Sequence, residues 1–241
     1  MRYLITFSYD GSKYSGYQKQ LDVNTVQSEL EKALTTLNND TVSVSASGRT
    51  DAGVHALNQQ AHFDLNINIT VDKLKMALNS LLPKYIYVKK VEEVDPDFHA
   101  RFNVKQKEYI YKINIGEYNP IEVDYIYQYN KELNIDKMKE AIKLFEGTHN
   151  FKSFASADDI RDNYERTIFK TNIDISNNII TISFVGNGFL RYMVRNMVGT
   201  LIEIGEGKVL DINKILDSQD RTKAGKTAPS QGLYLKEVSY N

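Results

Sequence analysis

The feature that most constrains the fold is the order in which strand-like and helix-like patterns follow one another. Residues 2–8 have the pattern of a strand, and the segment NTVQSELEKALTTLN then predicts a helix with Asn24 as its N-cap. The apolar face of this helix comprises Val26, Leu30, Leu34 and Leu37. The next elements are predicted strands at 41–45 and 60–65, a helix carrying Val71, Leu74, Leu78 and Leu81, and a strand at 86–94. The first half therefore has the order β-α-β-β-α-β.

The same order begins again after the irregular segment DPDFHARFN. The pattern predicts a strand at 107–115, a helix through Ile135, Met138, Ile142 and Phe145, strands at 167–175 and 179–184, a long helix and a strand at 233–238. This order is that of a split βαβ unit, whose helices cover one face of a sheet. The sequence thus predicts an α+β protein of two similar halves, residues 1–103 and 104–241, facing each other across a cleft.

Composition excludes several classes of function. A formal net charge of −1 over 241 residues does not indicate a nucleic-acid-binding protein, so any basic surface must be local. The absence of cysteine excludes disulfides, thiolate metal sites and cysteine nucleophiles, and suits a reducing cytoplasm. No segment resembles a signal peptide or a membrane span. The four histidines lack metal-ligand spacing, and no glycine pattern matches a nucleotide-binding loop, so we expect neither metal nor cofactor.

The segment SASGRTDAGVHA, residues 45–56, combines charge with small side chains. Gly48 and Gly53 permit positive φ or close backbone approach. Asp51 could simply cap a turn, and the loop alone favours that structural interpretation. The chemical interpretation is that Arg49, if its side chain reaches Asp51, keeps the carboxylate ionised. An ionised carboxylate can act as a nucleophile.

Two further patterns have an ordinary structural explanation. The segment FLRYMVRNMVGTLIEIG predicts a helix that is largely buried. Arg191 and Arg195 are four residues apart and lie beside its apolar stripe. The default interpretation of such a pair is a solvated basic edge of the helix. In EYIYKINIG, Tyr109, Tyr111 and Ile113 are two residues apart and therefore lie on the same side of a strand. Core packing is the default interpretation for tyrosines in this pattern.

Several motifs together resemble one known family. GRTDAGVHA closely resembles the signature loop of the tRNA pseudouridine synthase A family. The resemblance runs nearly end to end through these segments in order: YDGSKYSGYQKQ, TVQSELEKAL, DFHARF, KEYIYKI, FLRYMVRNMVG and GLYL. Several motifs in the same order are far more specific than one, and they outweigh the structural interpretations of the isolated patterns.

The resemblance implies the pseudouridine synthase fold: two similar halves with mainly antiparallel sheets, joined around a central RNA-binding cleft. It implies isomerisation of uridine to pseudouridine in tRNA, at positions 38–40 of the anticodon stem-loop, without cofactor or metal. The implied protein is a cytoplasmic homodimer that binds neither DNA nor membranes. Pooling positive charge from two subunits would help a chain of net charge −1 to bind RNA, through residues such as Lys19, Arg101, Arg161, Arg166 and Arg191.

The resemblance also assigns roles to residues. It implies Asp51 as the catalytic nucleophile and Arg49 as the residue that helps to extrude the nucleotide. Tyr109 would stack on the target base, Arg195 would be the partner of the aspartate, and Leu233 would contact the base. Arg101 and Arg191 are further expected substrate-binding residues.

The chemistry requires these residue types, but it leaves the route open. A glycosidic C–C bond replaces C–N, so the base must detach, rotate while held, and rejoin the sugar. The carboxylate of Asp51 can attack C6 of the uracil or C1′ of the ribose, or promote elimination to a glycal. The uridine must flip out of the stack, and the face of Tyr109 can replace the lost stacking.

Other functions are also compatible with parts of the sequence. A family paralogue could act on another RNA, such as ribosomal RNA, and a non-catalytic RNA-binding protein or chaperone could share the fold. The presence of Arg49, Asp51 and Tyr109 argues against the non-catalytic alternative. A hydrolase using carboxylates is disfavoured because no second acid is evident beside Asp51.

Overall fold

A computed structural model of the chain describes residues 1–240 and divides them into two compact units. Unit 1 comprises Met1–Lys105 together with the chain from Tyr234 onward, and unit 2 comprises Gln106–Leu233. The sequence pattern predicts a boundary near Asn103; the second unit begins at Gln106, and the end of the chain returns to the first unit.

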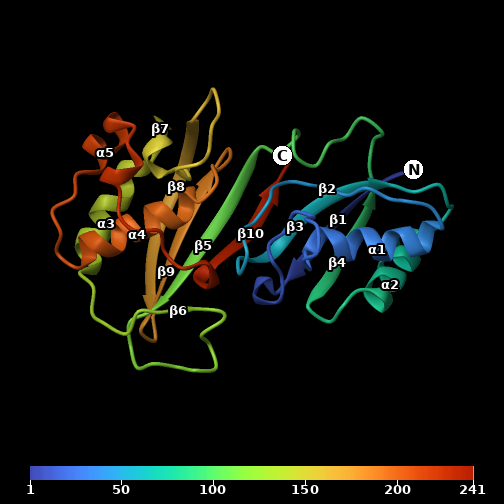
Figure 1. Cartoon of the computed structure of the whole chain (residues 1–241), viewed down its shortest axis with the longest axis horizontal. Helices are drawn as coiled ribbons and strands as arrows, with labels where there is room; N and C mark the ends of the chain where they lie inside the picture. Colours follow the sequence, from blue (N-terminus) through green and yellow to red (C-terminus); the bar gives the residue numbers. More distant parts are fainter. Residues whose placement is uncertain (241) are drawn as a thin grey trace. The chain divides into compact units, whose positions relative to one another are not determined.

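Unit 1 is a sheet with two helices on one face (Figure 1). Its elements are β1 (Arg2–Tyr9), α1 (Val26–Asn38), β2 (Ser45–Ala46), β3 (His55–Asp64), α2 (Val71–Leu81), β4 (Ile86–Glu93) and the larger part of β10 (Leu233–Ser239). The sheet order is β4-β1-β3-β2, with antiparallel neighbours. β2 pairs with β3 at Ala61 and His62, whereas β10 runs parallel to β3 at the other end, where Tyr234 lies opposite His55.

Unit 2 repeats this plan with additions. Its elements are β5 (Gln106–Asn114), β6 (Tyr127–Gln128), α3 (Ile135–Ile142), β7 (Gly147–Asn150), β8 (Glu165–Ser176), β9 (Ile179–Gly186), α4 (Met193–Gly205) and α5 (Ile212–Ser218). The order β5-β9-β8, again antiparallel, corresponds to β1-β3-β2 of unit 1. The predicted α+β class with mainly antiparallel sheets is confirmed.

Apolar side chains on the helices and strands build a core in each unit. In unit 1, Leu30 and Leu34 of α1 are fully buried, as are Ile5 and Phe7 of β1. In unit 2 the fully buried residues include Tyr111, Met138, Phe145, Phe184 and Met197. Within residues 1–240, no helix combines the length and hydrophobicity needed to cross a membrane.

Besides the start of β3, which lies at His55 instead of the predicted residue 60, three local predictions are wrong. The N-cap of α1 is Thr25, not Asn24, because Thr25 Oγ1 accepts from the Ser28 backbone N–H at 3.3 Å while Ser28 Oγ accepts from the Thr25 N–H at 3.2 Å. The helix predicted to include Phe145 ends at Ile142, and Phe145 lies in the 3-10 helix Lys143–Phe145. The third wrong prediction is the strand at 41–45.

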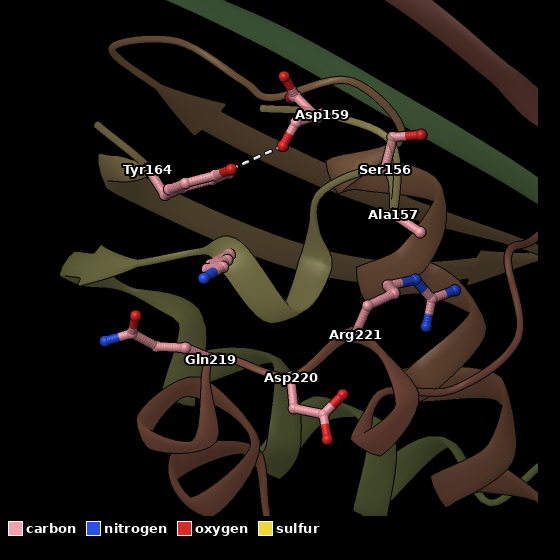
Figure 2. Close-up of a pocket in the computed structure, with 8 residues that line it drawn as sticks. Ser156, Ala157, Asp159, Tyr164, Gln219, Asp220 and Arg221 are labelled. Carbon is pink, nitrogen blue, oxygen red and sulfur yellow. Dashed lines mark hydrogen bonds between the residues drawn. The ribbon is translucent and has the colours of Figure 1, made fainter. Parts of the chain in front are cut away.

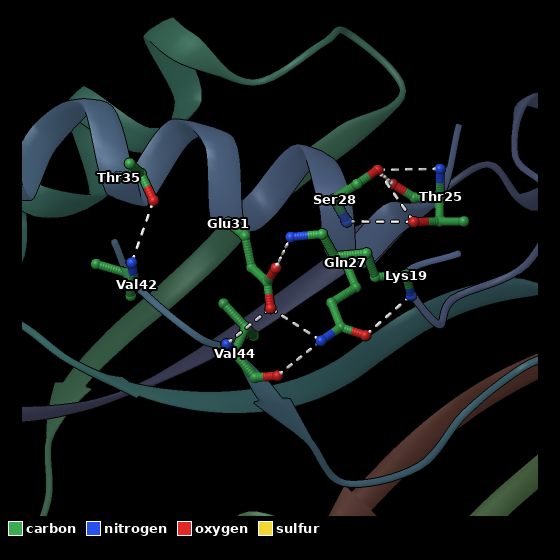
Figure 3. Close-up of polar contacts among 8 residues, drawn as sticks. All are labelled: Lys19, Thr25, Gln27, Ser28, Glu31, Thr35, Val42 and Val44. Atoms are coloured by element: carbon green, nitrogen blue, oxygen red, sulfur yellow. Dashed lines mark hydrogen bonds and ion pairs between the residues drawn. The ribbon is translucent and has the colours of Figure 1, made fainter. Parts of the chain in front are cut away.

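Side chains of α1 replace the strand partner that residues 41–45 would need (Figure 3). The Val42 N–H donates to Thr35 Oγ1 at 3.1 Å, and the Val44 N–H donates to Glu31 Oε1 at 3.2 Å. Gln27 Nε2 donates to Glu31 Oε1 at 2.9 Å and to the Val44 carbonyl at 3.3 Å. Because these backbone groups are satisfied by a helix, pairing with β3 is confined to the two residues of β2.

Candidate active site

The loop that carries Asp51 connects β2 to β3, and its first residues are fixed by a buried glutamine. The Ser47 N–H donates to the Gln60 carbonyl at 2.7 Å, and Ser47 Oγ donates to Gln59 Oε1 at 2.6 Å. Gln59 Nε2 donates in turn to the Gly48 carbonyl at 3.1 Å. Gln59 and Ser47 are fully buried, so these bonds form away from water and hold the start of the loop against β3.

The middle of the loop rests on the segment that follows β1. The Tyr9 hydroxyl and Thr50 Oγ1 are 2.8 Å apart, and the Tyr17 N–H donates to the Thr50 carbonyl at 3.0 Å. Gly16 has φ +98°, and a Cβ there would lie 3.1 Å from the Thr50 oxygen and 3.4 Å from the carbonyl carbon of Asp51. Burial raises the pKa of Tyr9 to about 12, so its hydroxyl keeps its proton at neutral pH.

The end of the loop is a turn held by Gly11. The Val54 N–H donates to the Asp51 carbonyl at 3.2 Å, with Gly53 at φ +77°. A Cβ on Gly11 would lie 2.0 Å from the Val54 oxygen, so only glycine fits there. The Gly11 N–H donates to Nδ1 of His55 at 3.1 Å. The backbone on both sides of Asp51 is therefore fixed by neighbours from β1, β3 and the segment between β1 and α1.

Arg49 is exposed and Asp51 is half-buried. An exposed arginine–carboxylate pair contributes only about 0–1 kcal/mol and costs side-chain entropy, so a spacing of two residues does not by itself enforce an ion pair between them. The exposure of Arg49 leaves its side chain accessible beside the Asp51 loop.

Arg101 lies in unit 1 on the DFHARF segment. The preceding Ala100 donates its N–H to Nδ1 of His62 at 3.1 Å, which requires that nitrogen to be unprotonated. Burial, and then the neighbouring His99, lower the pKa of His62, in agreement with this acceptor role. Arg101 itself is exposed, with its guanidinium 6.0 Å from the centroid of the Phe102 ring.

Tyr109 lies in unit 2 on β5, opposite Phe184 of β9. It is 8% exposed, and its ring meets the Phe189 ring edge-on, with centroids 5.0 Å apart and planes at 75°. The expected core packing is therefore present, and it also fixes the plane of the ring. Leu233, at the start of β10, is likewise buried.

Arg195, near the start of α4, is hydrogen-bonded to residues 225–228, which pack against this helix and form what we call the wrapping segment. Its Nε donates to the Ala228 carbonyl at 2.7 Å, and the Ala228 N–H donates to the Arg195 carbonyl at 3.1 Å. The wrapping segment approaches so closely that a Cβ on Gly199 would lie 1.6 Å from the Lys226 oxygen. Arg221 reinforces it by donating to Asn196 Oδ1 at 2.9 Å and to Thr227 Oγ1 at 3.0 Å.

The sequence interpretation missed this wrapping segment, and it missed Gln59. Nothing in the pattern of AGKTAPS, residues 224–230, indicates that this segment would hold Arg195. The available signal was Gly199, because a glycine inside a predicted helix can mark the close approach of another segment.

Three of the basic residues expected to bind RNA are already paired with carboxylates. Lys19 lies 2.9 Å from Glu31, Arg161 lies 2.7 Å from Asp159, and Arg191 lies 2.9 Å from Asp158. These pairs are at least partly exposed, so water and salt screen them.

Unit 2 also contains a pocket of about 260 Å³ (Figure 2). Its lining comprises Lys152, Ser156, Ala157, Asp159, Tyr164, Gln219, Asp220 and Arg221. The Tyr164 hydroxyl donates to the Asp159 carbonyl at 2.6 Å across one side of it. None of the predicted site residues lines this pocket. Among residues 1–240, no cluster of His, Asp and Glu side chains has the arrangement of a metal site.

Comparisons with known proteins agree over nearly the whole chain. A family model described as tRNA pseudouridine synthase matches residues 5–103 and 141–241. A protein of Geobacillus sp. strain WCH70 named tRNA pseudouridine synthase A is 46% identical over 98% of this chain and 97% of its own length. Proteins of the same name from Pseudothermotoga lettingae and Listeria monocytogenes serotype 4a are 45% and 46% identical, each over 99% of both chains.

A chain in the crystal structure of a Cbf5-Nop10-Gar1 complex shows a much weaker likeness: it aligns with 83% of this chain and 53% of its own length, at 10% identity and a TM-score of 0.35.

Proposed function

The chain belongs to the tRNA pseudouridine synthase family, and from that premise we propose that Asp51 is its catalytic nucleophile. The protein is an isomerase that converts uridine to pseudouridine in tRNA. The observation that supports Asp51 is the way its loop is built: Gln59, Tyr9 and Gly11 fix the backbone around a carboxylate that stays half-buried. A fixed carboxylate is what covalent catalysis requires.

The reaction is an isomerisation, so every atom of the substrate is conserved. The C1′–N1 bond breaks, a C1′–C5 bond forms, and the proton of C5 is lost while N1 gains one. Attack on C6, attack on C1′ and elimination to a glycal all use one carboxylate, as nucleophile or as base. Asp51 can serve each route, and none of them changes the oxidation state of the uracil–ribose unit as a whole.

The remaining site residues are proposed to hold the flipped nucleotide. Tyr109 presents a ring whose plane is fixed by Phe189, and it stacks on the uracil. Arg195, held through Nε by Ala228, supplies the positive charge that accompanies the Asp51 carboxylate in the reaction. Arg49 supports the stack that the flipped uridine leaves, and Leu233, Arg101 and Arg191 contact the RNA.

Tyr109→Ala is expected to slow single-turnover pseudouridine formation more than Tyr109→Phe does, because phenylalanine keeps the stacking face. Loss of stacking corresponds to about 1–3 kcal/mol for one base, or roughly five- to 150-fold. Equal loss in both variants, with RNA binding retained, would instead assign proton transfer to the hydroxyl. Equal activity of both variants and the wild type would remove Tyr109 from the site.

Tyr111→Phe is the matched control on the same strand. Tyr111 is fully buried, and its hydroxyl donates to the Pro229 carbonyl at 2.7 Å. Removing that bond is expected to lower stability by about 1 kcal/mol. The stacking face at Tyr109 should be unaffected, so a rate loss as large as that of Tyr109→Ala would indicate that packing, or the segment next to Pro229 that holds Arg195, accounts for the loss and not stacking.

We further propose positions 38–40 of the anticodon stem-loop as the target. Purified protein would be incubated with unmodified tRNA and, separately, with ribosomal RNA transcripts, and pseudouridine would be mapped at each uridine. Conversion at positions 38–40 supports the proposal. Conversion only elsewhere in tRNA would contradict the position, and conversion only in ribosomal RNA would identify a paralogue with another substrate.

The assembly and location of the protein are also proposals: a homodimer in the cytoplasm that binds tRNA and not DNA. A dimer would pool positive charge that a single chain, with net charge −1 and several arginines already paired, supplies only sparsely. Light scattering gives the mass directly, and tRNA binding should weaken with salt by a slope of about −0.7 to −0.9 for each neutralised phosphate. A monomer, or salt-independent binding, is the contradictory result.

A further inference from the structure

Tyr192 has an unusual backbone conformation. It is the residue before the first turn of α4, with φ +63° and ψ −2°, in the left-handed region that residues with a Cβ disfavour. Within residues 1–240 the other non-glycine residues with positive φ are all Asp, Asn or Gln. Glycine adopts this conformation at no steric cost, so a tyrosine here points to a use for its ring.

The Tyr192 ring lies against two guanidinium groups. The central carbon of the Arg195 guanidinium is 5.0 Å from the ring centroid, and that of Arg191 is 4.9 Å from it. Both distances are within the range of a cation–π interaction. Arg191 Nη2 also lies 3.4 Å from the Tyr192 hydroxyl.

The left-handed turn explains how one ring can serve both arginines. Residues four apart share a face only when both belong to the helix. α4 begins at Met193, so Arg191 lies before it and Arg195 lies in its first turn. The ring of the intervening Tyr192 supplies a surface that both guanidinium groups contact.

We propose that Tyr192 is a positioning residue for Arg195 in the pseudouridylation reaction. The Ala228 carbonyl fixes Nε of Arg195, and the ring restricts the plane of the guanidinium beyond it. Without the ring, the side chain of Arg195 samples more orientations, and the fraction aligned for the reaction falls. This inference rests on the proposed role of Arg195.

The test compares Tyr192→Phe, Tyr192→Ala and Tyr192→Gly with the wild type. Single-turnover rates are measured with enzyme in excess over unmodified tRNA, alongside the dissociation constant for tRNA and the melting temperature. Tyr192→Phe keeps the ring and should react at close to the wild-type rate. Tyr192→Ala should be slower by about threefold to thirtyfold, the range set by one cation–π contact, and this loss should persist when tRNA binding is saturated.

Tyr192→Gly separates positioning from structural support. It removes the ring but also the steric cost of the left-handed backbone, so it should melt no lower than Tyr192→Ala. Its rate should nevertheless be as low as that of Tyr192→Ala. Tyr118→Ala, which removes an exposed tyrosine elsewhere in unit 2, is the control and should leave all three measurements unchanged.

Four results would overturn the inference: a wild-type rate for Tyr192→Ala, recovery of the rate in Tyr192→Gly, a Tyr192→Phe rate as low as that of alanine, or a loss confined to tRNA affinity. Asp51→Asn is measured in parallel. An inactive Asp51→Asn beside a fully active Tyr192→Ala refutes the role of Tyr192 alone, whereas an active Asp51→Asn refutes the proposed function.

Discussion

Gly199→Ala is expected to lower both the stability of the protein and its rate of pseudouridine formation. The added Cβ would lie 1.6 Å from the Lys226 oxygen and 2.8 Å from the Lys226 carbonyl carbon, so backbone must move. Overpacking of this kind costs about 1–3 kcal/mol, and the helix preference of alanine offsets about 1 kcal/mol of it. Because the clash is with backbone, we expect a net loss of about 2 kcal/mol, or roughly 4–8 °C in melting temperature.

The rate should fall because the displaced segment also holds Arg195. Ala228, two residues after Lys226, accepts from Arg195 Nε and donates to the Arg195 carbonyl. Moving the segment by an ångström would shift the guanidinium, and misplacement on that scale can lower a rate by about a hundredfold. Differential scanning calorimetry and single-turnover kinetics measure the two effects.

Gly205→Ala is the matched control, since it makes the same substitution at the last residue of the same helix. There the new Cβ would meet Met138 Sδ at 2.8 Å, Leu133 Cδ2 at 3.1 Å and Leu133 Cβ at 3.2 Å, so its neighbours are side-chain atoms and not the backbone that holds Arg195. Stability should change less and the rate should not change. If Gly205→Ala lowered the rate as much as Gly199→Ala, the displacement of Ala228 and Arg195 would not explain the lower rate of Gly199→Ala.

The sequence predicts the regular elements well because their apolar residues follow a clear period. Val26, Leu30 and Leu34 mark one face of α1, and all three are fully buried. β9 alternates strictly between buried and half-buried residues, as its pattern predicts. Hydrophobic periodicity reports which face of an element meets the core, and this is the information that the fold of each unit needs.

The failures occur where polar side chains decide the structure. Val42 and Val44 have the composition of a strand, but their N–H groups bind Thr35 and Glu31 of α1 instead of another strand. The strand is predicted to start at residue 60, but β3 begins at His55. The prediction starts too late because Gln59, a polar residue that is fully buried, interrupts the apolar pattern. A hydrophobic pattern cannot reveal a buried polar residue whose partners are distant in sequence or outside any regular element.

The candidate site was identified from motif resemblance rather than from residue chemistry. Taken alone, the loop favoured a structural role for Asp51, and Tyr109 and Arg195 had ordinary explanations in packing and solvation. Neither the motif nor the chemistry of the single residues predicts that Gly11 and Gly16 support the Asp51 loop, or that Ala228 holds Arg195. These contacts join segments far apart in the sequence.

Asp51→Asn is expected to abolish catalysis while leaving the fold and RNA binding intact. Asparagine has nearly the same shape as aspartate, but its amide is a far weaker nucleophile and base. The loop itself is held by bonds from Ser47 to Gln59, between Thr50 and Tyr9, and from the Val54 N–H to the Asp51 backbone carbonyl, and these bonds do not use the Asp51 carboxylate. Removing a negative charge near phosphates should preserve or strengthen tRNA affinity.

Asp51→Glu tests whether position matters as well as charge. The additional methylene moves the carboxylate by more than about 1 Å, and misplacement of that size can cost about a hundredfold in rate. Because Gln59, Gly16 and Gly11 fix the loop, the backbone cannot easily retreat to compensate. A near-wild-type rate for Asp51→Glu would show that the carboxylate does not need the placement the loop provides.

The role of Asp51 is tested most directly by the single-turnover rate of Asp51→Asn, measured with enzyme in excess over unmodified tRNA and with saturating binding verified. We predict a loss of at least about 10⁴-fold, the scale on which removing a catalytic nucleophile lowers kcat. Pseudouridine formation at anything near the wild-type rate would contradict the assignment of Asp51 as the nucleophile and of this loop as the active site.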